Sequence, residues 1–585
     1  MTPRSAADPQ AAPHVLREYA VLADGERAAL VGPRGDIGWL CAPRWDSGSV
    51  FSALIGGRGA YVVTPRAPHV WGGSYEPGTL IWHSRWVTHE GVVECREALG
   101  YPGEGNRVVL LRRVIAQCPA RLRVLLWPRA DYDRSAVRRW RCDDGVWSGT
   151  TGPLRIRWSG AAAARPVGGG ALAMELDVAA GEQHDLVLEI VDGEFTDRPP
   201  EPDAAWLATA TAWGRAVPEF DAVRAPHDVA HSYAVLRGLT GAGGTVAAAT
   251  TSLPERAGDD RNYDYRYVWM RDQCLVGQAA AACGADPLLD VAVQVITERL
   301  LEHGDKLAPA YTVSGEPIPQ QHHLALPGYP GGHDVVGNDV RDQFQLDVFG
   351  EALLLLAAAA RHDRLDTRGW QAAEVAVEAA GRSWQRPDAG IWELEPRAWT
   401  HSRLIVAAGL RALAAARPRA RDRLAGSCVT LADRIVAETA RTALHADGCW
   451  QRAPDDPASD AALVLAGLRE AVPSGDPRTD ATLQAYLREL TVDGYAYRFR
   501  HDERPLHEAE GSFLLCGFAT ALALDQQGSH AEAIGWFERS RSACGPAGLF
   551  SEEYDALQHQ MRGNLPQTFV HALMIEASAA LAAGE

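Results

Sequence analysis

The sequence predicts two domains of different class, an antiparallel β-sandwich near the amino terminus and a larger helical domain after it. The chain of 585 residues exceeds what one hydrophobic core usually serves. Short runs with strand character fill the first third of the chain, and apolar residues recur every three or four positions beyond residue 225. Together these observations indicate a sheet domain followed by a helical one.

Strand-like runs that are apolar or alternate in polarity occur at residues 59–65, 79–89, 107–117, 122–130 and 171–179. Turn-forming Gly, Pro, Asn and Asp bound them, a pattern typical of antiparallel sheets. We therefore expect residues 1–202 to form the β-sandwich domain.

A proline-rich break, DRPPEP, ends the strand pattern and gives way to alanine-rich helical sequence. We assign residues 203–227 to a linker helix region and residues 228–585 to the helical domain. The later sequence holds about a dozen amphipathic or apolar segments with helical spacing. Consecutive antiparallel pairs of such helices can close into a ring with inner and outer layers, although an open array would have the same periodicity.

The amino-acid composition disfavours several classes of partner and cofactor. Acidic residues (75) outnumber Lys and Arg (57), so the net charge is −18, which disfavours binding to nucleic acid or to an anionic membrane. The ten cysteines are scattered, with no CxxC pair and no nearby histidine pair to suggest zinc. We expect no metal and no other cofactor. Since no signal-like or membrane-length apolar segment is seen, we expect a cytoplasmic protein that takes a small substrate, with a homo-oligomer as an open possibility.

The first chemical candidates lie in RNYDYRYVWMRD. Tyr265, Trp269 and Asp272 follow one another at i, i+4 and i+7, so they could share a helical face, with Arg271 beside it. An aromatic ring next to charged donors and acceptors suits a sugar. By spacing alone, a core aromatic stripe with a helix-terminal salt bridge is the preferred interpretation.

A second candidate, Glu393, lies between the apolar residues Trp392 and Leu394 in DAGIWEL. An apolar environment would raise its pKa, as a general acid requires near neutral pH. A helix-terminal carboxylate stabilised by the helix dipole explains the residue equally well.

Two further stretches carry charged residues ahead of apolar helices or loop formers. Arg498 and Glu510 precede the helix that begins in EGSFLLC, where Glu510 could simply occupy the first turn. Glu552, Glu553 and Asp555 crowd together in LFSEEYD. Acid and base carboxylates far apart in sequence are what glycoside hydrolysis with inversion requires, with the carboxyl groups about 6.5–9.5 Å apart.

Taken together, these stretches resemble family 15 of the glycoside hydrolases, the glucoamylase and bacterial trehalase group. The matching motifs come in the family's order, from Thr250 to about Glu576: TTSLPE, RNYDYRYVWMRD, LPGYPGGHDVVGN, DQFQLDVFGEAL, DAGIWE, THSR, EGSFLLCGF, LFSEEYD and GNLPQTFVHALMI. The resemblance implies a β-supersandwich followed by an (α/α)6 barrel, and exo-acting, inverting hydrolysis of a terminal α-glucosidic bond.

Roles follow motif by motif from the resemblance. Glu393 matches the general acid and Glu552, rather than Glu553, the general base. Arg271 and Asp272 match the pair that holds the terminal glucose. The remaining residues expected to contact or support the sugar are Tyr265, Trp269, Trp392, Arg498 and Glu510, the last in a supporting position.

The resemblance leaves several functions open. An α-glucosidase acting on short α-glucans is the first hypothesis, and a trehalase of the same family is its alternative. A phosphorolytic enzyme on a similar ring would need no base, which the intact SEEYD motif disfavours. A sugar-binding protein on an inactive hydrolase fold is the alternative that is not an enzyme.

Overall fold

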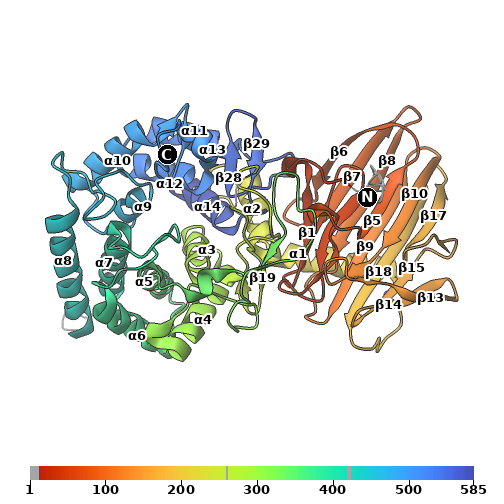
Figure 1. The fold of residues 1–585 in the computed structure, drawn as a ribbon, viewed down its shortest axis with the longest axis horizontal. Helices are drawn as coiled ribbons and strands as arrows, with labels where there is room; N and C mark the ends of the chain where they lie inside the picture. The colour runs from red at the N-terminus through yellow and green to blue at the C-terminus, as the bar shows by residue number, and fades with distance from the viewer. Residues whose placement is uncertain (1–11, 259–260, 418–422, 585) are drawn as a thin grey trace, which may run out of the picture.

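A computed structural model describes residues 12–258, 261–417 and 423–584 of the chain. Figure 1 shows a sheet domain on one side, built from the amino-terminal part of the chain, and a ring of helices on the other. The predicted order of a β-sandwich followed by a helical domain is confirmed.

The sheet domain contains two eight-stranded antiparallel sheets. The first runs β1-β2-β3-β5-β10-β17-β16, with β4 paired to β3: β1 (Ala20–Ala23), β2 (Ala28–Val31), β3 (Asp36–Cys41), β4 (Ser49–Phe51), β5 (Ala60–Pro65), β10 (Ala120–Trp127), β16 (Arg165–Pro166) and β17 (Leu172–Val178). The second runs β13-β14-β15-β18-β9-β8-β7-β6: β6 (His69–Tyr75), β7 (Trp82–Thr88), β8 (Val92–Leu99), β9 (Arg107–Ala116), β13 (Arg138–Asp143), β14 (Val146–Thr151), β15 (Leu154–Ser159) and β18 (Gln183–Asp192).

Aromatic side chains from both sheets meet in the core of this domain. Tyr61 of β5 and Trp158 of β15 pack edge to face with ring centroids 5.9 Å apart, and the indole N–H donates to the Tyr61 hydroxyl over 3.2 Å. β17 alternates buried and more exposed positions along its length. This alternation is the pattern from which the strands were predicted.

Six helices form the inner layer of the ring: α3 (Met270–Ala282), α5 (Asp347–Arg361), α7 (Thr400–Ala416), α9 (Ala462–Leu468), α12 (Leu514–Gln526) and α14 (Thr568–Ala583). Each contacts the next, and α14 returns to α3, so the ring is closed. The outer helices are α2 (Pro226–Gly238), α4 (Asp286–His303), α6 (Thr367–Ser383), α8 (Arg423–Ala443), α10 (Pro477–Glu489) and α13 (His530–Arg541). The closed (α/α)6 arrangement is therefore confirmed, and the open array is excluded.

Burial separates the two layers. In α5 every residue from Asp347 to Ala359 is buried, whereas α8 buries residues of one face only, such as Cys428, Ala432 and Ile435. An inner helix is covered on all sides by its neighbours and an outer helix only where it packs inward, which explains the two sequence patterns.

Two further helices, α1 (Pro202–Ala216) and α11 (Leu506–Ala509), and short strands complete the chain. The short strands are β11 (Arg129–Ala130), β12 (Ser135–Ala136), β19 (Thr240–Gly241), β20 (Gly244–Thr245), β21 (Val268–Trp269), β22 (Ala310–Tyr311), β23 (His322–His323), β24 (Val335–Val336), β25 (Thr491–Val492), β26 (Tyr495–Ala496), β27 (Ser512–Phe513), β28 (Glu553–Asp555) and β29 (Gln560–Arg562). α1 lies in the region predicted as a linker helix. Its Trp213 stacks on Tyr101 of the sheet domain, with centroids 3.9 Å apart. Within the described ranges, no helix has the length and apolarity needed to cross a membrane.

Candidate active site

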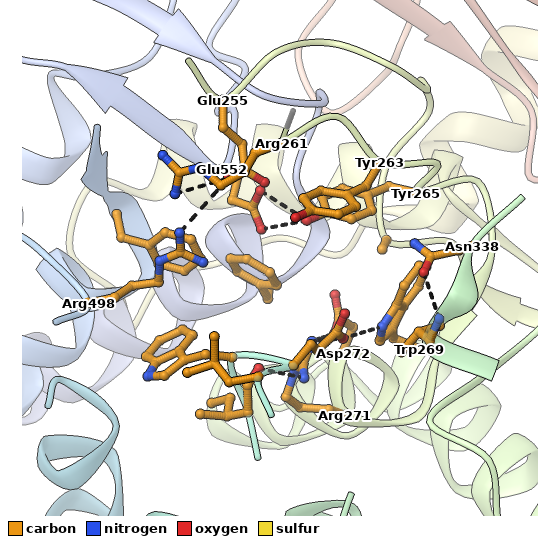
Figure 2. A pocket seen from close by; sticks show the side chains of 18 of the residues that line it. Glu255, Arg261, Tyr263, Tyr265, Trp269, Arg271, Asp272, Asn338, Arg498 and Glu552 are labelled. Carbon is orange, nitrogen blue, oxygen red and sulfur yellow. Dashed lines mark hydrogen bonds and ion pairs between the residues drawn. The ribbon is translucent and has the colours of Figure 1, made fainter. Parts of the chain in front are cut away.

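A cavity of about 370 Å³ is lined by residues from the loops and helix starts of the ring. Its wall includes all residues predicted for the site except Glu510: Tyr265, Trp269, Arg271, Asp272, Trp392, Glu393, Arg498 and Glu552. In Figure 2, Glu552, Glu255 and Arg498 gather on one side of the cavity and Arg271 and Asp272 on the other. The chain thus brings together side chains separated by up to 287 positions.

The expected helical face of Tyr265, Trp269 and Asp272 is wrong, because α3 begins only at Met270. Trp269 belongs to β21, whose pairing with β22 keeps it extended, and Tyr265 precedes that strand. The three side chains still reach the same cavity. Strand pairing with a segment some 40 positions later, rather than helical periodicity, positions Trp269. The backbone of Tyr265 is held by a hydrogen bond from the Ala248 amide to its carbonyl, over 2.9 Å.

Arg271 and Asp272, in the first turn of α3, form a charged pair at one end of the cavity. Arg271 Nη2 lies 3.4 Å from Asp272 Oδ2 and 3.6 Å from Glu393 Oε1, and Nη1 donates to the Ile391 carbonyl over 3.0 Å. Burial raises the pKa of Asp272 to about 6, although Arg271 opposes the rise. Asp272 Oδ2 is buried and accepts no hydrogen bond from the described part of the chain, and Arg271 is its charged neighbour.

Glu393 is held on a tight turn that Asp388 organises. The Asp388 carboxylate accepts hydrogen bonds from the Leu346 and Gly390 amides, at 3.2 and 3.0 Å, and from the Ser402 hydroxyl at 2.8 Å. Glu393 itself has a φ of +57°, in the left-handed region that residues other than glycine rarely adopt. Such strain is often retained at functional positions, and here it directs the carboxyl toward the cavity.

The apolar environment expected around Glu393 is not found. Its Oε1 accepts a hydrogen bond from Trp269 Nε1 over 2.8 Å and faces Arg271, and the side chain is 26% exposed. Trp392 instead directs its indole N–H to Asp460, 2.8 Å away, and packs edge to face on Phe513. Trp392 and Leu394 line the same cavity, but the contacts of the Glu393 carboxyl are the polar ones with Trp269 and Arg271, which adjacency in sequence could not indicate.

Glu552 lies on the opposite wall, directly before β28. The backbone of Glu552 accepts from the Leu514 amide at 3.2 Å, and the Tyr265 hydroxyl lies 3.1 Å from both carboxylate oxygens. Burial raises the pKa of Glu552 to about 7, while Arg498 opposes the rise. A buried carboxylate that titrates near neutral pH suits a general base.

Glu510 does not line the cavity; it lies behind Arg498. The Arg498 guanidinium donates to Glu510 Oε2 from Nε at 3.0 Å and from Nη2 at 2.8 Å, and His501 Nε2 lies 2.8 Å from the same oxygen. Although burial acts in the opposite direction, Arg498 and His501 lower the pKa of Glu510 to about 2. Glu510 is therefore a hydrogen-bonding partner of Arg498 behind the cavity wall, and the supporting position expected for it stays a prediction.

Sequence reasoning missed Glu255, Arg261 and Tyr263, which also line the cavity. Tyr263 stacks on Tyr265 with centroids 6.1 Å apart, and Arg261 Nη1 lies 3.6 Å from Glu255 Oε2. The TTSLPE motif contained the signal for Glu255, because a carboxylate ends a run that matches the family pattern.

Two carboxyls facing one cavity, each held by an aromatic hydrogen-bond donor, together with a buried Arg–Asp pair, define the site of a glycoside hydrolase. The profile of glycosyl hydrolases family 15 matches residues 230–579, and that of the trehalase-like N-terminal domain matches residues 8–204. The chain belongs to glycosyl hydrolases family 15.

Several known proteins are similar over most of the chain. The trehalases of Mycobacterium tuberculosis and Mycolicibacterium smegmatis are each 29% identical over 96% of this chain, covering 89% and 90% of their own lengths. Trehalase 1 of Sulfolobus acidocaldarius is 30% identical over 59% of this chain and 62% of its own length. A bacterial glucoamylase complexed with acarbose shares the fold, with a TM-score of 0.70 and 13% identity over 98% of this chain and 96% of its own.

Proposed function

We propose that the protein hydrolyses α,α-trehalose with inversion at one anomeric carbon, using Glu393 as general acid and Glu552 as general base. The observation that carries the proposal is the placement of these two carboxyls on one cavity, Glu393 beside Trp269 and Glu552 beside Tyr265. The aromatic rings of Tyr265 and Trp269 pack edge to face, 5.5 Å apart, and form the wall between them.

In the proposed reaction Glu393 donates its proton to the glycosidic oxygen while Glu552 removes a proton from the attacking water. The C1–O bond of the held glucose breaks as the water oxygen bonds to C1 from the opposite face. Arg271 and Asp272 bind hydroxyls of that glucose. Both carboxyls must then exchange their protons with solvent before the next turnover.

Trehalose is preferred here over short α-glucans, the substrate favoured by the motifs alone. Relatives similar along nearly the whole chain are named trehalases, whereas the likeness to the bacterial glucoamylase concerns the fold. The catalytic motifs do not separate the two substrates, so similarity to the trehalases across both domains supports the preference.

Anomer-resolved NMR of the first products tests the proposal. Inverting hydrolysis of trehalose yields one β-glucose from the attacked ring and one α-glucose from the leaving ring, whereas retention would yield α-glucose only. Exclusive release of β-glucose from maltotriose, with trehalose untouched, would favour the glucan alternative. Glu552→Gln should lower kcat by about 10²–10⁴-fold, and a protein that only binds sugar would show no turnover to lose.

A further inference from the structure

A third carboxyl, Glu255, lies beside the proposed base. Its side chain is 4% exposed, it lines the cavity, and it is within hydrogen-bonding contact of the Glu552 carboxyl. Figure 2 shows both groups on the same wall. This position is close enough to influence how Glu552 handles a proton.

The loops that carry the two carboxyls are fixed to each other. The Gly563 amide donates to the Pro254 carbonyl over 2.9 Å, next to Glu255. A methyl group placed on Gly563 would lie 3.5 Å from Glu552 Cβ and 3.6 Å from Glu255 Cγ, so one glycine backs both side chains. The backbone hydrogen bond and the shared glycine thus hold the two side chains next to each other.

The buried carboxyls around Glu255 outnumber the cations beside them, which favours a proton on at least one carboxyl. Arg261 and Arg498 each form ion pairs with the three buried glutamates Glu255, Glu510 and Glu553. Glu552 is a fourth buried carboxyl near Arg498, whose charge opposes the rise of its pKa, and His501 contacts Glu510. Glu510 receives the short hydrogen bonds of Arg498. Glu553 accepts from the Gly511 amide at 2.9 Å and from Arg498 at 3.3 Å, but burial and the charge of Glu255 raise its pKa well above the usual range, so it too favours the protonated form.

Glu255 has no comparable partner among the described residues. Its Oε2 lies 3.6 Å from Arg261 and 3.9 Å from Arg498, beyond hydrogen-bonding distance. An ionised carboxylate can only accept hydrogen bonds, so two carboxyls in contact need a proton between them. Glu552 already accepts from Tyr265 and must be ionised to act as a base.

We propose that Glu255 and Glu552 share one proton in the active enzyme, with Glu255 as the donor that holds the Glu552 carboxylate toward the attacking water. The inference rests on the proposed function of Glu552 and makes Glu255 a positioning residue. Burial and the charge of Glu552 raise the pKa of Glu255 to about 8, opposed by Arg498 and Arg261. The other titratable groups around the pair are Tyr263, Tyr265, Glu510 and Glu553.

The pair predicts a specific dependence on pH. Below about pH 7 Glu552 takes up a proton itself. Between about pH 7 and pH 8 Glu255 keeps its proton and donates to the ionised Glu552 carboxylate. Above about pH 8 both groups are ionised, repel each other and lose the oriented hydrogen bond. Glu255→Gln supplies a permanent N–H donor in place of the titrating O–H, so the loss at high pH should disappear.

Hydrolysis of α-glucosyl fluoride tests this step apart from Glu393, because fluoride leaves with the electron pair of the C1–F bond and needs little acid assistance. Fluoride release is measured from pH 6 to pH 9 for wild type, Glu255→Gln, Glu255→Ala and Glu552→Gln. Glu255→Gln should stay within about tenfold of wild type at pH 7, and its rate relative to wild type should rise severalfold by pH 9. Glu255→Ala should lose about 10–100-fold, the value of a hydrogen bond to a charged group.

Glu378→Gln serves as a matched control, since Glu378 is 71% exposed on the outer helix α6; its profile should match wild type. A Glu255→Gln to wild-type ratio that stays constant across this pH range would overturn the inference. So would an inactive Glu255→Gln beside an active Glu552→Gln, which would exchange the two roles. If thermal melting shows that Glu255→Ala is not folded, the pH dependence of the Glu255→Gln to wild-type rate ratio still tests the inference.

Failure of the proposed function looks different. A wild-type protein that releases no fluoride, or a Glu552→Gln variant as fast as wild type, contradicts the role of Glu552 itself, and the inference falls with it. An inactive Glu552→Gln with a Glu255→Gln profile parallel to wild type contradicts the shared proton alone.

Discussion

The Tyr265 hydroxyl hydrogen-bonds the Glu552 carboxylate, 3.1 Å from each oxygen, and favours its ionised form. Burial acts in the opposite direction and raises the pKa of Glu552 to about 7. A base must be ionised, so kcat/KM should fall about tenfold per pH unit as the pH drops below this value. Removing the hydroxyl in Tyr265→Phe raises the Glu552 pKa further, and the acid limb of the kcat/KM profile for trehalose should move to higher pH.

Tyr263→Phe provides the matched control for this prediction. Tyr263 stacks on Tyr265 and presents a hydroxyl to the same cavity, but its hydroxyl makes no hydrogen bond with Glu552 in the described structure. The acid limb of the kcat/KM profile of Tyr263→Phe should coincide with that of wild type. A Tyr265→Phe limb that is unmoved or shifted to lower pH would contradict the role given to the hydroxyl.

At the scale of elements, α5 and α7 approach each other through glycines. A Cβ on Gly409 of α7 would collide with the Gly350 carbonyl oxygen of α5 and lie 2.8 Å from Leu353 Cβ. A Cβ on Gly350 would lie 2.6 Å from the Ile405 carbonyl. Backbone atoms cannot rotate away as side-chain ends do, so the ring has no room for a methyl group there.

Gly409→Ala should therefore destabilise the protein by about 1–3 kcal/mol, the usual cost of overpacking a close-packed core. Chemical denaturation followed by circular dichroism measures the loss. Gly535→Ala on the outer helix α13 is the control, because no atom lies within 4 Å of the added methyl. That variant should gain up to about 1 kcal/mol from helix propensity alone. Equal stability of the two variants would show that the α5–α7 contact yields to a methyl group.

Local periodicity predicted the elements far better than their ends. The sequences of α5 and α14 are almost wholly apolar because these inner helices are buried along most of their length, and both helices were predicted. The start of α3 was misjudged because β21 pairs with β22, a contact between distant segments. The left-handed φ of Glu393 could not be predicted from the sequence either, since it depends on the turn held by three hydrogen bonds to the Asp388 carboxylate.

Sequence reasoning likewise identified some features of the candidate site and missed others. Motif resemblance identified Glu393 and Glu552, but not the contact of Glu255 with Glu552 or the place of Glu510 behind Arg498. These depend on which loops meet above the ring. These loops are held together by hydrogen bonds between backbone segments hundreds of positions apart, such as the one between Gly563 and Pro254.

At the scale of the whole molecule, the sheet domain supports the loop that carries Tyr265. Arg266, 1% exposed, donates from Nη1 to the backbone carbonyls of Trp45 and Ser47, over 3.2 and 3.0 Å. Its other nitrogens bind Asp264, with Nε and Nη2 at 2.8 and 2.6 Å from the carboxylate oxygens. Arg266, the residue that follows Tyr265, thus hydrogen-bonds to the amino-terminal domain while it forms a buried ion pair with Asp264.

Because burial of both partners is nearly complete, removing one should be costly. Arg266→Met leaves Asp264 charged and unpaired inside the protein, and the expected loss of stability is about 3–5 kcal/mol. The double variant Asp264→Asn with Arg266→Met removes that charge and should recover part of the stability. Neither variant restores the contact with the sheet domain, so kcat for trehalose should stay reduced in both, because Tyr265 loses its support.

Differential scanning calorimetry and trehalose turnover together test this coupling. The control is Arg364→Met, which breaks an exposed pair with Asp290, 2.9 Å apart, and should change stability by no more than about 1 kcal/mol. Wild-type turnover in the Arg266→Met variant would refute the link between the sheet domain and the site. A double variant as unstable as Arg266→Met would instead show that the lost contacts with the sheet domain, rather than the unpaired Asp264 charge, cause the destabilisation.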